Sequence, residues 1–214
     1  MKCLIINYNR LTLLKSTVEW CASHGLEPVI IDNASNYPPL MAYYETCGHN
    51  VLRMSRNFGH RVAWDTGLIS SLGLQRERYI LTDPDLDYTG IPDDFLYVLN
   101  EGLDRHRGYA KCGFSLLLDD LPPTDEGNFI RKNEADYWLA PVDDMYYVAG
   151  IDTTFALYRE GNIKHTYSAI RTNKPYTARH LPWYYDDFSV LPEDEQNYYR
   201  TANSSCSHLK RIKI

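Results

Sequence analysis

A chain of 214 residues can bury one substantial core, so we expect a single large domain. Its hydrophobic content of 44% with 23% charged residues is typical of a soluble globular protein and excludes a disordered or fibrous chain. The formal net charge of -6 argues against nucleic-acid partners, which require clustered Lys and Arg.

The first half of the chain alternates short apolar runs with helical patterns. Residues 2–7 (KCLIIN) predict a buried strand, and residues 11–25 predict a helix that stops at Gly25. The alternation continues with a strand over 27–32, a helix over 38–48, a strand over 50–54, a helical pattern over 60–74 and a strand over 78–82. This order predicts an α/β fold, with a mostly parallel central sheet and helices on both faces.

The regular alternation stops near Tyr109. Residues 109–118 and 153–159 have strand patterns, residues 126–138 have a helical pattern, and residues 171–187 are irregular and aromatic. We therefore divide the single domain 1–214 into three parts that follow one another along the chain. They are a Rossmann-like half of nucleotide-binding type (1–105), a mixed C-terminal half that shares its sheet (106–202), and a tail or linker (203–214).

Polar residues follow the predicted parallel strands at the point where each strand ends. They are Asn7, Tyr8, Asn9 and Arg10 after the first strand, Asp32 and Asn33 after the second, and Asp83, Asp85 and Asp87 after the fourth. In open α/β sheets, ligands bind beyond the carboxyl ends of the strands. We therefore expect these side chains to converge on one crevice.

The segment TDPDLDYTG places three carboxylates at alternate positions, Asp83, Asp85 and Asp87. An EF-hand calcium loop does not fit, because Tyr88 stands where that loop needs Gly, Asp94 where it needs Glu, and a strand precedes it. A solvated turn leaves the mutual repulsion of the carboxylates uncompensated. A hard divalent cation such as Mn²⁺ or Mg²⁺, shared with substrate phosphates, would offset that repulsion.

Four ordered motifs resemble glycosyltransferases of the GT-A fold, in particular family 2-like enzymes that use nucleotide sugars. Asp83-Pro84-Asp85 resembles the DxD motif, while IINYNR and IDNAS resemble the first two strands with their loops. NFGHRVAWDTG resembles the segment N-x-G-x-x-x-A-x-N-x-G, except that Asp65 replaces the more usual Asn. The resemblance covers roughly residues 1–90 well and the rest loosely. It implies an inverting, metal-dependent hexosyltransferase with a UDP-sugar donor and a glycan or glycoprotein acceptor.

The resemblance also implies roles for the polar strand ends. Tyr8 would stack on uracil, Asp32 would accept from a base NH, and Asn9 or Asp83 would reach the ribose hydroxyls. Candidates for the remaining nucleotide-sugar contacts are Asn7, Asn33, Asn57 and Asp65, and the candidate pyrophosphate partners are Arg10, Arg56 and Arg61. Each surface arginine can equally be a solvated side chain.

Metal binding and proton removal fall to the remaining candidates. Asp85 is the first candidate metal ligand, followed by Asp83, with Asp87 either a third ligand or acting through water, and His180 as the ligand from the C-terminal half. Asp152 is the candidate general base. Four other carboxylates compete with it: Asp186, Asp187, Glu193 and Asp194. Trp183, Tyr184 and Tyr185 form an aromatic run that can contact an acceptor sugar or simply pack.

Two other functions remain open. A sugar nucleotidyltransferase shares the α/β half and the metal carboxylates but usually has a glycine-rich loop near the N-terminus, and NYNRLTLL contains no glycine. A noncatalytic sugar-binding or calcium-binding module is the second alternative. The donor sugar also stays open, because glucose and deoxyhexoses of the rhamnose type differ by single hydroxyl groups.

Five cysteines without a CxxC pair favour a reducing compartment, so we expect a cytoplasmic protein. No apolar window approaches the ~18 residues of a membrane span, and we expect neither membrane insertion nor a signal peptide. The whole chain also resembles the N-terminal domain of large chlorella-virus glycosyltransferases that decorate capsid protein. That resemblance implies further domains in a longer chain and a location in the host cytoplasm.

Overall fold

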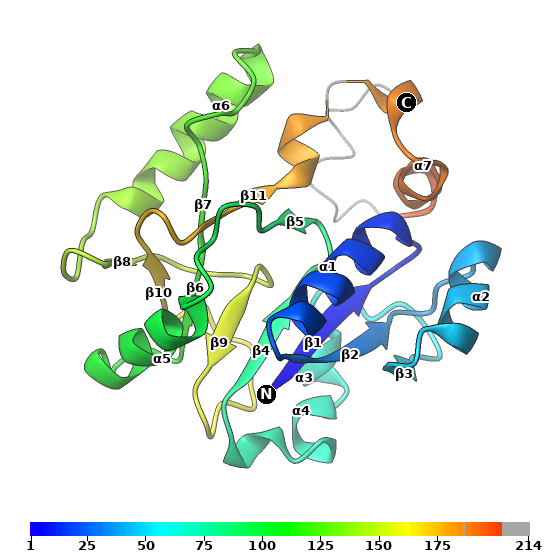
Figure 1. The fold of residues 1–214 in the computed structure, drawn as a ribbon, viewed down its shortest axis with the longest axis horizontal. Helices are drawn as coiled ribbons and strands as arrows, with labels where there is room; N and C mark the ends of the chain where they lie inside the picture. The colour runs from blue at the N-terminus through cyan, green and yellow to red at the C-terminus, as the bar shows by residue number, and fades with distance from the viewer. Residues whose placement is uncertain (186, 203–214) are drawn as a thin grey trace.

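The computed structural model describes residues 1–185 and 187–202; Asp186 and the predicted tail 203–214 lie outside the described residues. Within the described chain, the main sheet has eight strands in the order β3-β2-β1-β4-β9-β6-β10-β8 (Figure 1). These strands are β1 (Lys2–Asn7), β2 (Glu27–Asp32), β3 (Asn50–Arg53), β4 (Tyr79–Thr82), β6 (Lys111–Gly113), β8 (Tyr146–Val148), β9 (Ala156–Tyr158) and β10 (Ala169–Thr172).

The sheet changes character at β9. Strands β3, β2, β1 and β4 are parallel to one another, and β6 is parallel to β10. Strand β9 runs antiparallel to both β4 and β6, and β8 runs antiparallel to β10. A second, three-stranded sheet contains β5 (Leu86–Asp87), β11 (Thr177–His180) and β7 (Ser115–Leu116). The predicted α/β class, with a Rossmann-like parallel half and a mixed C-terminal half, is confirmed.

Helices cover the main sheet on both faces, because alternate strand residues point to opposite sides. On one side Cys3 and Ile5 of β1 belong to a core with α1 (Thr12–Ser23) and α5 (Phe95–Arg105). On the other side Leu4 and Ile6 belong to a core with α3 (Val62–Asp65) and α4 (Leu68–Ser71). The remaining helices are α2 (Pro38–Thr46), α6 (Asp125–Glu134) and α7 (Glu193–Thr201), with 3₁₀ turns η1 (Leu74–Arg76), η2 (Ala135–Trp138), η3 (Leu181–Tyr184) and η4 (Phe188–Val190).

Two of the predicted elements are divided in the structure. The helical pattern over 60–74 is broken into α3, α4 and η1, because Gly67 and Gly73 adopt left-handed φ angles of 73° and 77° that interrupt a helix. The predicted strand over 109–118 is divided between the two sheets, as β6 and β7. Both differences come from short elements linked by turns, which a periodic pattern does not resolve.

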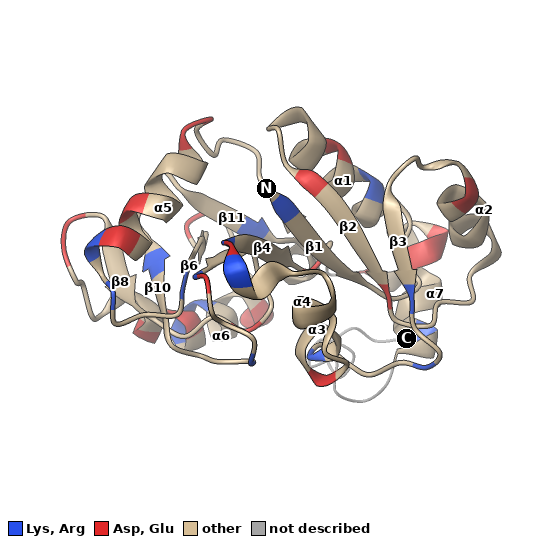
Figure 2. Cartoon of the chain, turned by 90° about the horizontal axis from the view of Figure 1, so that it is seen from below, with Lys and Arg blue, Asp and Glu red and all other residues tan. Residues whose placement is uncertain are grey.

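The thiols that lie in apolar segments are buried, and charges of both signs are spread over the chain. Cys3 and Cys21 are buried and unbonded, with their Sγ atoms 3.6 Å apart. Basic and acidic positions are interspersed over the helices and loops of both halves (Figure 2). In the part of the chain that the structure describes, no helix is both long enough and apolar enough to cross a membrane.

Candidate active site

A cavity of about 310 Å³ lies beyond the carboxyl ends of β1, β2 and β4 and is bordered by the loop that precedes β9. The structure therefore brings together a large part of the predicted site. Predicted residues that line the cavity are Tyr8, Arg10, Asn33, Asn57, Asp83, Asp85, Asp152 and His180. They come from both halves of the chain, so the cavity lies where the parallel and mixed parts of the sheet meet.

Asp85 is a buried carboxylate that the chain itself neutralises. Its Oδ2 atom accepts a short hydrogen bond from Nη1 of Arg10 and lies 3.5 Å from Nε2 of His180. Burial would raise the pKa of Asp85, but the charges of Arg10 and His180 outweigh burial and hold this pKa well below its usual range. Arg10 is in turn 3.2 Å from Oε1 of Glu195 on α7. The acidic triplet thus has a cationic partner built into the protein.

Asp83 has a different environment from Asp85. Its backbone NH donates to the carbonyl of Thr153 at 3.0 Å, and its Oδ2 atom accepts from the Thr153 hydroxyl at 2.5 Å. Burial and the negative charge of Asp85 raise the pKa of Asp83 well above its usual value. These two hydrogen bonds join the end of β4 to the loop that carries Asp152, so both carboxylates border the same space.

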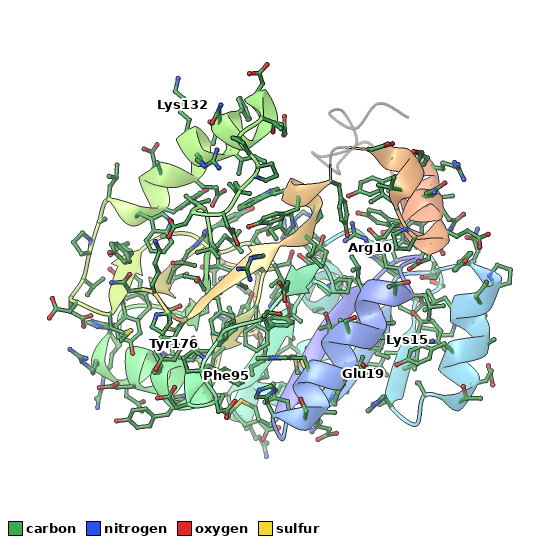
Figure 3. The ribbon with its side chains drawn as sticks, turned by 45° about the horizontal axis from the view of Figure 1, so that its top comes forward. Arg10, Lys15, Glu19, Phe95, Lys132 and Tyr176 are labelled. Carbon is green, nitrogen blue, oxygen red and sulfur yellow. The ribbon has the colours of Figure 1, made fainter. Side chains whose placement is uncertain are left out.

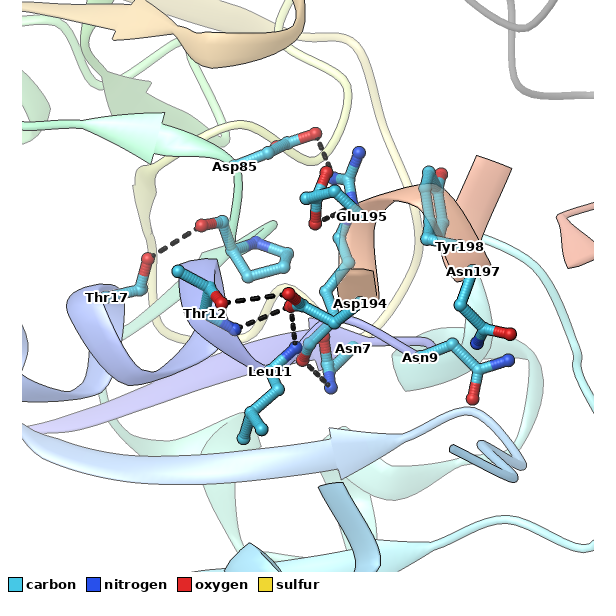
Figure 4. Close-up of polar contacts among 12 residues, drawn as sticks. Asn7, Asn9, Leu11, Thr12, Thr17, Asp85, Asp194, Glu195, Asn197 and Tyr198 are labelled. Atoms are coloured by element: carbon cyan, nitrogen blue, oxygen red, sulfur yellow. Dashed lines mark hydrogen bonds and ion pairs between the residues drawn. The ribbon is translucent and has the colours of Figure 1, made fainter. Parts of the chain in front are cut away.

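Helix α7 closes one side of the cavity and was not predicted from the sequence. Asp194 accepts from the backbone NH groups of Leu11 and Thr12 at 2.7 Å each, and from the Thr12 hydroxyl at 2.9 Å (Figure 4). It therefore caps the N-terminus of α1, which has no side-chain cap of its own. Figure 3 shows Arg10 between the start of α1 and α7, where its guanidinium lies 3.8 Å from the ring centre of Tyr198.

Three other residues that were predicted to bind the nucleotide sugar do not line the cavity. Their side chains form hydrogen bonds within the loops. Asn7 donates to the carbonyl of Arg10 and to the Tyr44 hydroxyl. Asn9 adopts a left-handed φ of 54°, and its Oδ1 atom accepts from two backbone NH groups of the loop after β2. Asp32 is buried and accepts from the NH of Ser35 and from the Tyr44 hydroxyl. These three side chains hold the strand-end loops in place.

Four further predicted residues, Arg56, Arg61, Asp65 and Asp87, do not line this cavity. Arg61 lies 3.4 Å from Asp65 in an exposed pair, and Arg56 lies over the ring of Phe58. Asp87 accepts from the NH and hydroxyl of Thr89 and lies 3.4 Å from Arg179. It borders a separate hollow of about 320 Å³, so Asp87 is not next to Asp83 and Asp85 in the cavity.

Asp152 is half-exposed and lies in a loop that a buried lysine supports. The Nζ atom of Lys111 on β6 donates to the Asp152 carbonyl at 2.9 Å and to the Tyr158 hydroxyl at 3.0 Å. Burial lowers the pKa of Lys111 to about 7, although the charge of Asp152 opposes this shift. The carboxylate of Asp152 contacts Nε2 of His165 at 3.1 Å. Lys111 and His165 were not identified from the sequence, because they contact Asp152 only through the fold.

Among the described carboxylates that competed with Asp152, none lines the cavity. Asp194 is occupied as the cap of α1, and Asp187 caps η4 by accepting from the NH of Ser189. Glu193 is exposed in the first turn of α7. Asp186 lies outside the described residues. The geometry therefore favours Asp152 within the part of the chain that can be compared.

A second cavity of about 290 Å³ adjoins the first and shares Asp152, Thr154 and His180 with it. Aromatic rings line it, from Trp183, Tyr137 and Tyr167. Arg171, which also lines it, donates to the carbonyl of Gly150, lies 3.4 Å from Glu134 and has its guanidinium over the ring of Tyr137. This cavity therefore combines aromatic rings with the paired charges of Arg171 and Glu134.

The residues at the Asp83 and Asp85 end fit a hard divalent cation. Arg10 and His180 lie near Oδ2 of Asp85, whereas its buried Oδ1 atom has no hydrogen-bond partner among the described residues. A buried carboxylate oxygen without a donor is unusual, and a cation ligated by oxygen would satisfy it. Two carboxylates with His180 close by supply the donors that Mn²⁺ accepts.

No family model and no curated protein sequence matches the chain. Among solved structures, it is similar to glucosyl-3-phosphoglycerate synthase from Mycobacterium tuberculosis in complex with phosphoglyceric acid. The TM-score is 0.44 and the sequence identity is 10%, over 74% of this chain and 56% of that chain. This chain thus spans little more than half the length of that protein. A likeness at this level carries no information about activity.

Proposed function

We propose that the chain is a metal-dependent, inverting glycosyltransferase domain of the GT-A fold that takes its sugar from a UDP-sugar. The observation that carries this proposal is the arrangement of carboxylates around one cavity. Asp83 and Asp85 border it from the end of β4, and Asp152 borders both this cavity and its aromatic neighbour. A donor and an acceptor in adjoining cavities would meet at Asp152.

The donor end of the cavity has suitable partners for a nucleotide. The half-buried ring of Tyr8 at the end of β1 can stack on uracil, and Asn33 after β2 can contact the base or ribose. Arg10 supplies a positive charge for the diphosphate, since its guanidinium already lies beside Asp85 at the cavity wall. Asp32, Asn7 and Asn9 hold the loops that position these groups.

Asp83 and Asp85 would hold Mn²⁺ or Mg²⁺, with His180 as a further candidate ligand. When bound there, the cation would stabilise the negative charge of the departing diphosphate. Asp87 is left out of this ligand set because it faces a different hollow. Arg10 would then exchange part of its contact with Asp85 for contact with the diphosphate. The same guanidinium would thus bind Asp85 in the empty site and the diphosphate in the occupied site.

Proton removal is assigned to Asp152. Its carboxylate would accept the proton of the acceptor hydroxyl while the acceptor oxygen bonds to the anomeric carbon. The bond between that carbon and the β-phosphate oxygen breaks, and its electron pair leaves with UDP. Lys111 donates a hydrogen bond to the backbone carbonyl of Asp152, which keeps the carboxylate within reach of both cavities. A single displacement of this kind inverts the anomeric centre.

The second cavity suits a neutral sugar as acceptor. Trp183 and Tyr137 present rings on which a pyranose can stack, and the Glu134 carboxylate can accept from its hydroxyls. Because Arg171 is already paired with Glu134, an anionic acceptor would find little compensation here. We therefore propose a glycan or glycoprotein acceptor. The sequence resemblance, and not the cavity, is the basis for proposing a glucose-type or rhamnose-type donor and a longer chain of the capsid-decorating viral type that acts in the host cytoplasm.

A screen of UDP-sugars for Mn²⁺-dependent hydrolysis tests this function. We expect turnover of one hexose or deoxyhexose donor, and loss of that turnover on chelation. Asp152→Asn should lower transfer to an added acceptor by roughly 10²- to 10⁴-fold, the usual contribution of a general base, with UDP affinity unchanged. Asp187→Asn is the matched control and should retain activity. Cleavage of UTP in preference to UDP-sugars would instead indicate nucleotidyl transfer, and no response to any nucleotide would contradict the proposal.

A further inference from the structure

We propose that His60, Asp152 and His165 form a second metal site, distinct from the Asp83 and Asp85 end of the cavity and selective for a transition metal such as Zn²⁺. The three residues come from three separate loops, after β3, before β9 and after β9. One ligand atom from each lies within 4.8 Å of the other two. The fold thus gathers two imidazoles and one carboxylate at one point.

The spacing of these atoms suits a metal ion. Nε2 of His165 lies 3.1 Å from Oδ1 of Asp152, and Nε2 of His60 lies 3.8 Å from the same oxygen. Ligands on tetrahedral Zn²⁺, with bonds of about 2.1 Å, stand roughly 3.4 Å from one another. The two separations from Asp152 bracket that value, and all three ligand atoms lie within 4.8 Å of one another, so rotation of the side chains can bring them onto one ion.

The surroundings leave the side chains of His60 and Asp152 room to rotate, whereas they hold the ring of His165 in place. His60 and Asp152 are each about half exposed, and both border the 310 Å³ cavity. The His165 side chain is only 7% exposed, and its ring packs edge-on against Trp64 at 5.0 Å and Tyr167 at 4.9 Å. His165 therefore serves as the anchor, while the other two side chains can close on the ion from the cavity side.

The donor atoms separate this site from the other one. Imidazole nitrogen suits Zn²⁺, Co²⁺ and Ni²⁺, whereas carboxylate oxygens suit Mg²⁺ and Mn²⁺. The affinity of such donors also rises from Mn²⁺ toward Zn²⁺. The two ends of the cavity should consequently select different metals. In terms of the proposed function, an ion at this site would hold the carboxylate assigned to proton removal, so Zn²⁺ should inhibit transfer.

Calorimetric titration of Zn²⁺ alone into the nucleotide-free chain tests this site without any requirement for activity. We expect one saturable site in the wild type that persists in Asp85→Asn. Loss of a partner outside the ligand shell typically weakens metal binding 10–100-fold, so loss of a ligand in His60→Ala or His165→Gln should weaken it by at least roughly tenfold. His49→Ala, a partly exposed histidine in the turn before β3, is the matched control and should bind normally.

A second measurement, with Co²⁺, makes the result decisive. Co²⁺ bound to the wild type should show visible absorption bands that disappear in His60→Ala, a half-exposed position where loss of the fold is not expected. Equal Zn²⁺ affinity in the wild type, His60→Ala and His165→Gln would overturn the proposal, as would loss of binding in Asp85→Asn or His49→Ala. Because no nucleotide is present, the result is independent of whether glycosyl transfer is observed.

Discussion

Asp85 and Asp152 line the same cavity but lie in opposite kinds of environment. Asp85 is 7% exposed, is paired with Arg10 and lies beside His180, and these charges hold its pKa well below the usual range despite burial. The Asp152 side chain is 48% exposed, and its close partners are imidazole rings. Asp85 is thus held in the ionised form that ligates a cation, whereas a carboxylate that removes a proton needs access to the acceptor. The two environments match those two tasks.

The protein itself compensates most of the charge in the acidic triplet. Clustered aspartates were expected to need a divalent cation to offset their repulsion. The structure shows that Arg10 neutralises Asp85 and that His180 lies 3.5 Å from the same carboxylate. Thr153 hydrogen-bonds Asp83, and Asp87 lies 3.4 Å from Arg179. The cluster is therefore tolerated by the protein alone. The case for a metal rests instead on the unpartnered Oδ1 atom of Asp85 and on the cavity that Asp83 and Asp85 share.

The strongest way to break the Asp85 environment is Arg10→Met. This change leaves Asp85 and Glu195 buried without their shared cation, and loss of one partner of a buried ion pair typically costs about 3–5 kcal/mol. We expect the free energy of unfolding in urea to fall by that amount. Lys15→Met, on the exposed face of α1, is the control and should fall within about 0.5 kcal/mol of the wild type. A stable Arg10→Met variant would show that the buried charges are compensated elsewhere.

A second prediction concerns pH and Glu195. Burial raises the pKa of Glu195 to about 7 from 4.5, against the opposing charge of Arg10. Between these pH values the folded chain keeps a proton that the unfolded chain releases. The contribution of Glu195 to the free energy of unfolding is thus fully present below about pH 4.5. It is lost as pH rises through 7, by up to about 1.4 kcal/mol per pH unit.

Glu195→Gln has no proton to release, so the difference in unfolding free energy between variant and wild type should shift in favour of the variant from pH 4.5 to pH 7. Urea melts at several pH values measure this difference. A difference that does not change with pH would mean that Glu195 titrates alike in the folded and unfolded chains.

Asp152→Asn sharpens the comparison from the exposed side. Because the Asp152 carboxylate is half exposed and its loop is held through backbone contacts with Lys111 and Tyr158, the folded state should tolerate the change. We expect an unfolding free energy within about 0.5 kcal/mol of the wild type, the usual range for surface substitutions. Thermal melts followed by circular dichroism measure this. A large loss of stability would assign Asp152 a structural role and weaken its assignment as the base.

Much of the fold was predictable where apolar periodicity is strong. The β1 and β4 runs read as buried strands and are completely buried from Cys3 to Ile5 and from Tyr79 to Thr82. Helix α5 was missed although Phe95, Val98 and Leu99 follow a helical period and pack into the core. Helix α7 is harder to predict, because most of its residues are polar and its place is set by Asp194 and Glu195 on distant partners.

In the candidate site, too, the sequence predicted residues placed by local pattern but not residues placed by tertiary contacts. Strand ends predicted Asp83 and Asp85, and a strand-like run predicted Asp152, because local sequence sets these positions. Lys111, Thr153 and Glu195 were not identified, since each acts on a residue that is remote in sequence and adjacent only after folding. Arg56 and Arg61 were expected to reach the pyrophosphate, but each lies against a neighbour in its own loop or helix. Local motifs indicate where chemistry is placed, and tertiary contacts decide which side chains reach it.

Calorimetric titration of UDP in the presence and absence of Mn²⁺ tests the central claim most directly, with Asp85→Asn and Asp87→Asn compared in parallel. These two variants change the same residue type in the same acidic triplet, but only Asp85 borders the 310 Å³ cavity. We expect Mn²⁺ to strengthen UDP binding in the wild type and in Asp87→Asn, and to have no effect in Asp85→Asn. UDP affinity that is indifferent to Mn²⁺ in the wild type, or a metal effect lost only in Asp87→Asn, would contradict the account.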